Sequence, residues 1–412
     1  LASAGRAWPS SLRGLAVEVP AQLLRPATGP PDESGGAEQP VRIDALCKRA
    51  HVRLDEGACR VEVTLSLRAD DGAVHTFQLL HATAGSAAAE DLAASAAFAQ
   101  LGSLVNAQLT HVREARRRCL LLRAPAPVWL TPDVALRAWE PAALSLQAVL
   151  AAECAQRGSE AEAPVELARA RLSREVGGAD GELLRDVEEG ELLKELGGLV
   201  SPSALLRHMH ATLPMPNAFT LWRKVFAQQL GVQALLGHAL GLPPVWAHSL
   251  HLCAATGSVL HLEEEVALTP ARSADGSLAA VPFRLTRNMQ VALGPFALEG
   301  PYVAAIASTA EAMHHRKCPL EAWLSCLERD RPVRWTCEPL ATEGDEAVRR
   351  PNPVLGRIAA LAPSHALDLA QAQPVGQHPS VVSMNLKVAE LIEAATSATN
   401  LGRMPPGWQA WL

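Results

Sequence analysis

Three histidines and a run of glutamates have the spacing in this sequence that comes nearest to a site for chemistry. His248, His251 and His261 lie close together along the chain, and Glu263–Glu265 follow them directly. Zinc sites combine histidines with cysteines or carboxylates at set intervals, and this spacing lacks such a set, which disfavours a metal centre. The glutamates can hold a cation or form a solvated turn. The sequence contains no G-x-x-x-x-G-K-[ST], G-x-G-x-x-G or G-x-S-x-G motif.

These residues lie within a longer pattern that has the frame of a kinase active site. Leu236–Glu265 reads LGHALGLPPVWAHSLHLCAATGSVLHLEEE, and Val281–Leu293 reads VPFRLTRNMQVAL. The pattern resembles the phosphatidylinositol-3-kinase-related kinase family, in which G-D-R-H-x-x-N-I-L is followed by T-G, I-H-I-D-F-G and V-P-F-R-L-T. The frame is kept by Gly237, Leu240, Gly241, Leu242, Leu250, Thr256, Gly257, Val259, His261 and Leu262.

The residues that would carry chemistry in that family are replaced here. Pro244 stands in place of the catalytic-loop aspartate, Trp246 in place of the histidine, and Ser249 in place of the metal-binding asparagine. Phosphoryl transfer needs an acceptor for the substrate's proton and oxygen ligands for magnesium. The proline side chain has neither donor nor acceptor, and the serine hydroxyl is a shorter and weaker ligand than an amide oxygen.

One acidic position survives in altered form. Glu263 begins the segment that replaces D-F-G, but its carboxylate lies one methylene further out, and magnesium tolerates little change in geometry. No aspartate occurs between Asp186 and Asp275, and no lysine between Lys48 and Lys194, where the family's phosphate-binding lysine is expected. The resemblance therefore implies a pseudokinase with no catalytic residues, cofactor or metal. A divergent active Ser/Thr protein kinase that uses Glu263 and a nonstandard base remains the alternative.

The hydrophobic pattern predicts the elements that must position this loop. Apolar and polar residues alternate over Val61–Leu67, which predicts a strand. A hairpin turn is expected at Asp70–Gly72, and the returning strand at Val74–Leu80. A long amphipathic helix is expected from Pro216, with Phe219, Trp222 and Phe226 on its buried face. Other expected elements are a helix over 86–109, strands and hinge at Cys119–Leu122 and Val128–Leu130, and a helix from Ser201–Pro202.

The end of the chain carries a second resemblance. Leu386–Ala395 predicts a short amphipathic helix, and the segment Asn400–Leu412 resembles the FATC tail that closes these proteins. Because the acids are lost, the best match is the pseudokinase branch, the transformation/transcription-domain-associated protein family. Pro216–Leu230 and Val281–Met289 support that match. Since the chain starts at Leu1 rather than Met, we expect it to be the C-terminal piece of a longer protein. Because the segment that resembles the FATC tail ends at Leu412, we expect the C-terminus to be native.

The resemblance implies an α+β fold of the bilobal protein-kinase-like type, with a small β-rich lobe and a larger helical lobe. The predicted segments are a lead-in and linker at 1–40, a pseudokinase N-lobe at 41–135, a C-lobe at 136–337, a disordered linker at 338–380 and a FATC tail at 381–412.

Composition narrows the class further. A net charge of −6 argues against a general nucleic-acid-binding surface. The eight cysteines are scattered without any C-x-x-C pair, which fits a reducing compartment. No apolar run approaches the roughly 20 residues of a membrane span, so no membrane partner is expected.

The family resemblance implies a function that composition alone does not. It implies the non-catalytic region of a large nuclear scaffold subunit in histone acetyltransferase coactivator complexes. The expected partners are other subunits of such a complex and, through upstream regions, transcription activators. This role belongs to transcription regulation and chromatin modification.

Overall fold

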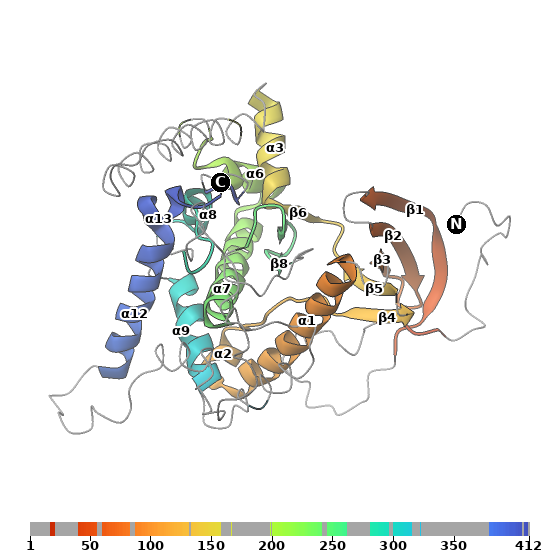
Figure 1. Cartoon of the computed structure of the whole chain (residues 1–412), viewed down its shortest axis with the longest axis horizontal. Helices are drawn as coiled ribbons and strands as arrows, with labels where there is room; N and C mark the ends of the chain where they lie inside the picture. Colours follow the sequence, from red (N-terminus) through yellow and green to blue (C-terminus); the bar gives the residue numbers. More distant parts are fainter. Residues whose placement is uncertain are drawn as a thin grey trace, which may run out of the picture. The chain divides into compact units, whose positions relative to one another are not determined.

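The computed structural model describes much of the chain in two compact units (Figure 1). The first unit comprises 1–104, 124–142 and 263–266, and the second comprises the rest of the chain. The described residues are 17–20, 40–55, 60–82, 87–131, 133–157, 166, 198, 200–240, 245–261, 281–295, 300–314, 322, 379–405 and 408–410.

The first unit is built on a five-stranded antiparallel sheet with the strand order β1-β2-β3-β5-β4. Asp71 accepts a hydrogen bond from the Ala73 N–H at 2.8 Å, and Gly72 has a φ of 82°, so a hairpin turn joins β2 to β3 as predicted. The strands are β1 (Ile43–Asp55), β2 (Arg60–Ala69), β3 (Val74–Ala82), β4 (Pro127–Thr131) and β5 (Val134–Trp139).

Both faces of this sheet bury apolar side chains. Val19, from the lead-in segment, packs with Phe77 and Leu136 in one cluster, and its N–H donates to the Val41 carbonyl at 2.9 Å. A second cluster joins Leu80 and Ala135 to Leu92 of helix α1 (Ala87–His111). The helix expected over 86–109 is therefore confirmed, and its first half covers the sheet.

The strand expected at Cys119–Leu122 is wrong. Residues 120–126 have no regular structure, and Cys119 adopts a φ of 54°. The reason lies in α1, because the Asn106 side chain binds both backbone groups of Leu122. Its Oδ1 accepts from the Leu122 N–H at 2.7 Å, and its Nδ2 donates to the Leu122 carbonyl at 2.9 Å. A side chain thus takes the bonds that a neighbouring strand would supply.

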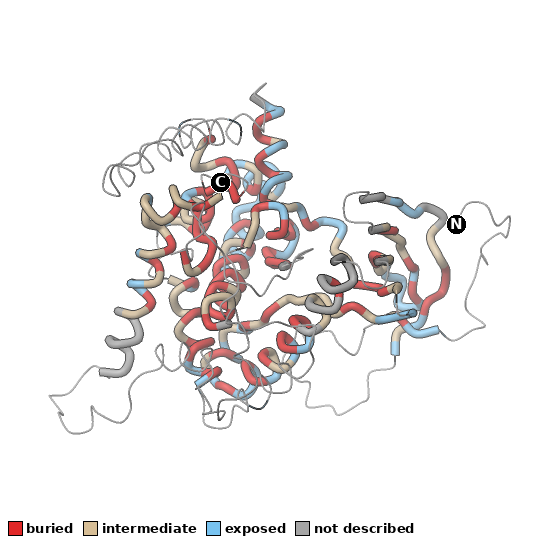
Figure 2. The backbone as a smooth tube through the Cα atoms, in the orientation of Figure 1, coloured by how far each residue is buried: buried red, intermediate tan, exposed pale blue. Residues whose placement is uncertain are grey.

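The second unit is mainly helical and is centred on α7 (Pro216–Leu240), which packs against α8 and α9. Figure 2 shows buried positions along α7 and α9, in agreement with a core that includes Trp222, Phe226 and Ile306. The other helices are α2 (Arg113–Arg117), α3 (Leu146–Arg157), α6 (Ala204–Thr212), α8 (Arg287–Leu293), α9 (Pro301–His314), α12 (Pro379–Thr396) and α13 (Ala398–Gly402).

A small antiparallel sheet, in the order β6-β7-β8, completes this unit; its strands are β6 (Ala143–Ser145), β7 (Leu250–Cys253) and β8 (Val259–His261).

The long helix from Pro216 is confirmed. The helix expected from Ser201–Pro202 begins later, at Ala204, because the Ala204 N–H closes a turn on the Ser201 carbonyl. The tail helix is confirmed and is longer than predicted. Judged by length and apolarity together, none of the described helices meets the requirement for crossing a membrane.

Candidate functional site

Three aromatic side chains stack along one face of α7, the helix that precedes the segment 245–250. Phe219, Trp222 and Phe226 follow the spacing of one helix face and stack with centroid distances of 5.8 and 5.0 Å. Trp222 and Phe226 are fully buried. Arg223 lies over the Phe219 ring at 4.6 Å and donates to the Ala292 carbonyl, and burial lowers the pKa of its guanidinium. These contacts fix the first half of α7 in the core of the second unit.

Two glutamines of α7 form hydrogen bonds to β8, the second strand after the segment 245–250. Gln229 accepts from the Val259 N–H at 2.7 Å, and Gln233 donates to the Val259 carbonyl at 3.1 Å. These bonds take the place of a further strand beside β8. They hold the backbone of Val259, one of the frame positions, whose own side chain is fully buried in the core.

The turn between β7 and β8 explains two more frame positions. The Thr256 hydroxyl accepts a hydrogen bond from the Ser258 N–H and donates one to the Ser258 hydroxyl at 2.7 Å. These two bonds close the turn. Gly257 has a φ of 73°, and a Cβ added there would lie 2.4 Å from the Trp222 carbonyl oxygen. Both the backbone conformation and the close approach require glycine.

Two glycines of α7 have opposite surroundings. A Cβ at Gly231 would lie 2.7 Å from the Tyr302 carbonyl oxygen and 2.9 Å from the Ala305 Cβ, where α9 crosses α7. A Cβ at Gly237 would meet no atom within 4 Å. Packing therefore explains glycine at position 231 and does not explain it at frame position 237.

This contrast predicts opposite effects for the same substitution. Gly231→Ala is expected to lower the free energy of unfolding by about 1–3 kcal/mol, because the two helices must separate. Gly237→Ala is expected to raise it by about 0.5–1 kcal/mol, because alanine favours the helix. Urea denaturation of both variants checks the pair, and an equal effect of the two would contradict the described crossing.

The structure places two of the four predicted site residues. Trp246 is partly buried, and Ser249 is 4% exposed. The Ser249 N–H donates to the Trp246 carbonyl at 3.2 Å, which folds Val245–Leu250 into a tight turn. Pro244 and Glu263 lie outside the described residues. The degenerate loop is hereafter the described segment 245–250.

The chemistry available at this loop is narrow. Residues 245–261 contain no carboxylate and no lysine, and their imidazoles belong to His248, His251 and His261. His251 Nδ1 lies 3.2 Å from the Ser249 carbonyl oxygen, and His248 lies beside the Trp246 ring at 5.8 Å. Imidazoles can move protons, but nothing in this segment supplies the carboxylate ligands that magnesium prefers. In the described part of the chain, no three His, Cys, Asp or Glu side chains gather as metal ligands do.

The C-terminal tail packs against Trp246. A buried cluster joins Leu401, Met404 and Trp408 of the tail to Val281, and Trp246 lies on this cluster. Trp408 is 1% exposed, so the tail buries this indole against the second unit. Trp411 lies outside the described residues. Where the family resemblance expects a catalytic histidine, this chain therefore has an apolar contact with its own tail.

Arg284 joins the loop and the tail. Its Nη1 donates to the Trp408 carbonyl at 2.7 Å and to the Val245 carbonyl at 3.3 Å, and its Nη2 donates to the Gln409 carbonyl at 2.9 Å. The guanidinium lies 4.3 Å from the centre of the Trp408 ring. Arg284 is 3% exposed, and burial lowers its pKa to about 9. Sequence reasoning missed this role, although a charged residue between Phe283 and Leu285 is the signal that marks it.

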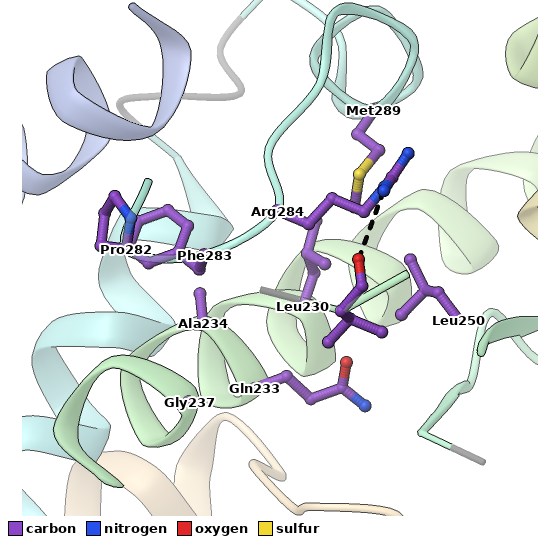
Figure 3. Close-up of a pocket in the computed structure, with 10 residues that line it drawn as sticks. Leu230, Gln233, Ala234, Gly237, Leu250, Pro282, Phe283, Arg284 and Met289 are labelled. Atoms are coloured by element: carbon purple, nitrogen blue, oxygen red, sulfur yellow. Dashed lines mark hydrogen bonds between the residues drawn. The ribbon is translucent and has the colours of Figure 1, made fainter. Parts of the chain in front are cut away.

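A small cavity beside Arg284 completes the site (Figure 3). Its volume is about 30 Å³, and Gln233, Gly237 and Phe283 are among its lining residues. Arg284 donates to the Val245 carbonyl beside this cavity, and the figure draws a dashed line for this hydrogen bond of Arg284. Such a volume has room for a water molecule, whereas pockets for small ligands span roughly 300–1,000 Å³. This cavity is therefore too small to hold a ligand of the usual size.

Comparison with known proteins identifies the class. Residues 382–412 match the FATC domain. A solved structure, "FAT and kinase domain of CtTel1", superposes with a TM-score of 0.65 at 18% identity, over 91% of this chain and 24% of that one. The fold is therefore the α+β kinase-like fold of the phosphatidylinositol-3-kinase-related proteins, and the expected fold class is confirmed.

The chain is similar in sequence to transcription-associated proteins and to a protein kinase. The "Transformation/transcription domain-associated protein" of Danio rerio is 28% identical over 76% of this chain. The "Serine/threonine-protein kinase ATR" of Oryza sativa subsp. indica is 27% identical over 78%. The "SAGA complex/NuA4 acetyltransferase complex subunit Tra1" of Schizosaccharomyces pombe is 23% identical over 84%. These relatives confirm the expected resemblance to the transformation/transcription domain-associated proteins.

The chain spans only a small part of these relatives. It covers 8% of the length of the Danio rerio protein, 11% of the Oryza sativa protein and 10% of the Schizosaccharomyces pombe protein. What the whole relatives do therefore does not transfer directly to this region.

Proposed function

We propose that this chain is the non-catalytic pseudokinase and FATC region of a large scaffold subunit in a histone acetyltransferase coactivator complex of the nucleus. There it serves transcription regulation and chromatin modification. The observation that carries the proposal is Trp246. It stands where the resemblance expects a catalytic histidine, and it packs on the tail cluster of Leu401, Met404 and Trp408.

The pattern of kept and lost residues supports a role in binding rather than in transfer. The kept positions Thr256, Gly257 and Val259 hold a hairpin against α7. The replaced positions are those that serve phosphoryl transfer in the family. In addition, the sequence has no lysine between Lys48 and Lys194, where the phosphate-binding lysine is expected. A scaffold needs shape and surface but no proton acceptor or magnesium ligand, so selection for binding alone accounts for this pattern.

The names of the relatives support the partners. One relative is a subunit of the SAGA and NuA4 acetyltransferase complexes, and others carry transcription-associated names. We propose that the partners are other subunits of such a complex, and that transcription activators bind regions upstream of this chain. No direct nucleic-acid or membrane partner is proposed, in keeping with the net charge of −6.

A divergent protein kinase is the second candidate. The 27% identity to the kinase from Oryza sativa favours it, as does Glu263, which keeps a carboxylate at the metal-binding segment. Such an enzyme would need another base in place of Pro244 and another anchor for the phosphates. Three simultaneous replacements make this candidate the weaker one.

The test is affinity purification of the tagged full-length protein from nuclear extract, with the tag alone as control. The proposal expects acetyltransferase and adaptor subunits to be recovered with the tagged protein. Recovery of a phosphorylated substrate, with phosphorylation abolished by Glu263→Ala, would overturn the proposal in favour of the kinase.

A further inference from the structure

Arg284 is a buried cation whose hydrogen-bonding partners are main-chain carbonyls. Its three acceptors are the Val245, Trp408 and Gln409 carbonyl oxygens, and no carboxylate among the described residues pairs with it. A guanidinium without a counter-ion is costly to bury unless its donors are satisfied. Its burial therefore depends on keeping these carbonyls in place.

The acceptors come from two segments far apart in the sequence. Val245 belongs to the degenerate loop, whereas Trp408 and Gln409 belong to the tail. Neither segment alone supplies the three acceptors of the Arg284 Nη1 and Nη2 atoms. If the tail leaves, two of the three carbonyls leave with it, and water must reach Arg284. Trp246 would lose its apolar partners at the same time, because it lies on the same buried cluster as Trp408.

The backbone of the tail is bent at this contact. Gln409 is 6% exposed and has a φ of 58°, a left-handed conformation that costs a non-glycine residue free energy. The carbonyl of this residue is the one that accepts from Arg284 Nη2. A strained residue persists where its surroundings hold it, and here the guanidinium is what holds it.

We propose that Arg284 is a latch that couples docking of the C-terminal tail to closure of the degenerate loop, so that both segments open and close as one unit. Because two of the three acceptors are backbone carbonyls of the tail, displacement of the tail breaks both bonds at once. Displacement would bare Trp246 and the loop together.

Hydrogen exchange of the full 412-residue chain, read by mass spectrometry, tests this coupling. Arg284→Met is expected to speed exchange about tenfold or more in both the 245–250 and the 401–410 peptides, because hydrogen bonds to a charged group are lost. Peptides from β2 and β3 of the other unit are expected to be unchanged. Faster exchange in only one of the two segments would overturn the latch, as would a uniform rise across the second unit.

A matched control and a milder variant complete the experiment. Arg223→Met removes an arginine that is only partly buried, stacks on a ring and binds one carbonyl, and that residue contacts neither segment. It is expected to leave exchange in both segments unchanged, and a rise equal to that of Arg284→Met would contradict the proposal. If Arg284→Met does not fold, Arg284→Lys keeps the charge but cannot span the three carbonyls. It is expected to open both segments together, and exchange like that of the native chain would overturn the proposal.

Discussion

Truncation of the chain after Asn400 is expected to lower the free energy of unfolding of the helical unit by several kcal/mol or to make the protein insoluble. The truncation removes Leu401, Met404 and Trp408 from a buried cluster and leaves Arg284 without two of its acceptors. The loss of a buried tryptophan side chain alone costs about 3–5 kcal/mol. Trp408→Ala should therefore reproduce most of the effect.

Thermal and urea denaturation measure this loss. Trp129→Ala is the matched control, because Trp129 lies on strand β4 with 42% of its surface exposed. That substitution is expected to change the stability by less than about 1 kcal/mol. A truncated chain that melts like the intact one would show that the tail is a free recognition element rather than part of the fold.

The second large effect is expected at Gly257. Gly257→Ala forces a left-handed conformation on a residue with a side chain and places the Cβ 2.4 Å from the Trp222 carbonyl oxygen. The conformational term costs about 1–2 kcal/mol and the overpacking a further 1–3 kcal/mol, so a loss of about 3 kcal/mol is expected.

A second glycine separates these two terms. Gly72 has a φ of 82°, but a Cβ there meets nothing within 4 Å. Gly72→Ala is therefore expected to cost only the conformational term, about 1–2 kcal/mol. Equal losses for both substitutions in urea denaturation would mean that the hairpin does not press on α7 as described.

Local patterns were enough to predict the strands and helices whose signals lie in adjacent residues. Alternation around Val61–Leu67, the Asp-Gly turn and the aromatic spacing on α7 all predicted what the structure contains. The failure at Cys119–Leu122 has a tertiary cause, because the Asn106 side chain takes both backbone bonds of Leu122. No pattern within 119–122 carries that information.

The candidate site divides in the same way. The replacements at Pro244, Trp246 and Ser249 were readable from sequence, because each stands within a frame whose other residues are kept. The contacts that Trp246 and Arg284 make with the tail were not readable, because the tail lies more than a hundred residues further along the chain. The placement of Pro244 and Glu263 remains a prediction, as do the segment boundaries at 40, 135, 337 and 380.

Binding of ATP with magnesium tests the central claim most directly, because both candidates share a fold and differ in this property. A ligand at about 100 times its dissociation constant stabilises a protein by roughly 2.7 kcal/mol. With millimolar ATP and magnesium, the account predicts that the melting temperature does not rise as such a stabilisation would require. The same result is expected for the native chain and for Glu263→Ala. A magnesium-dependent rise in the native chain that Glu263→Ala abolishes would contradict the pseudokinase account.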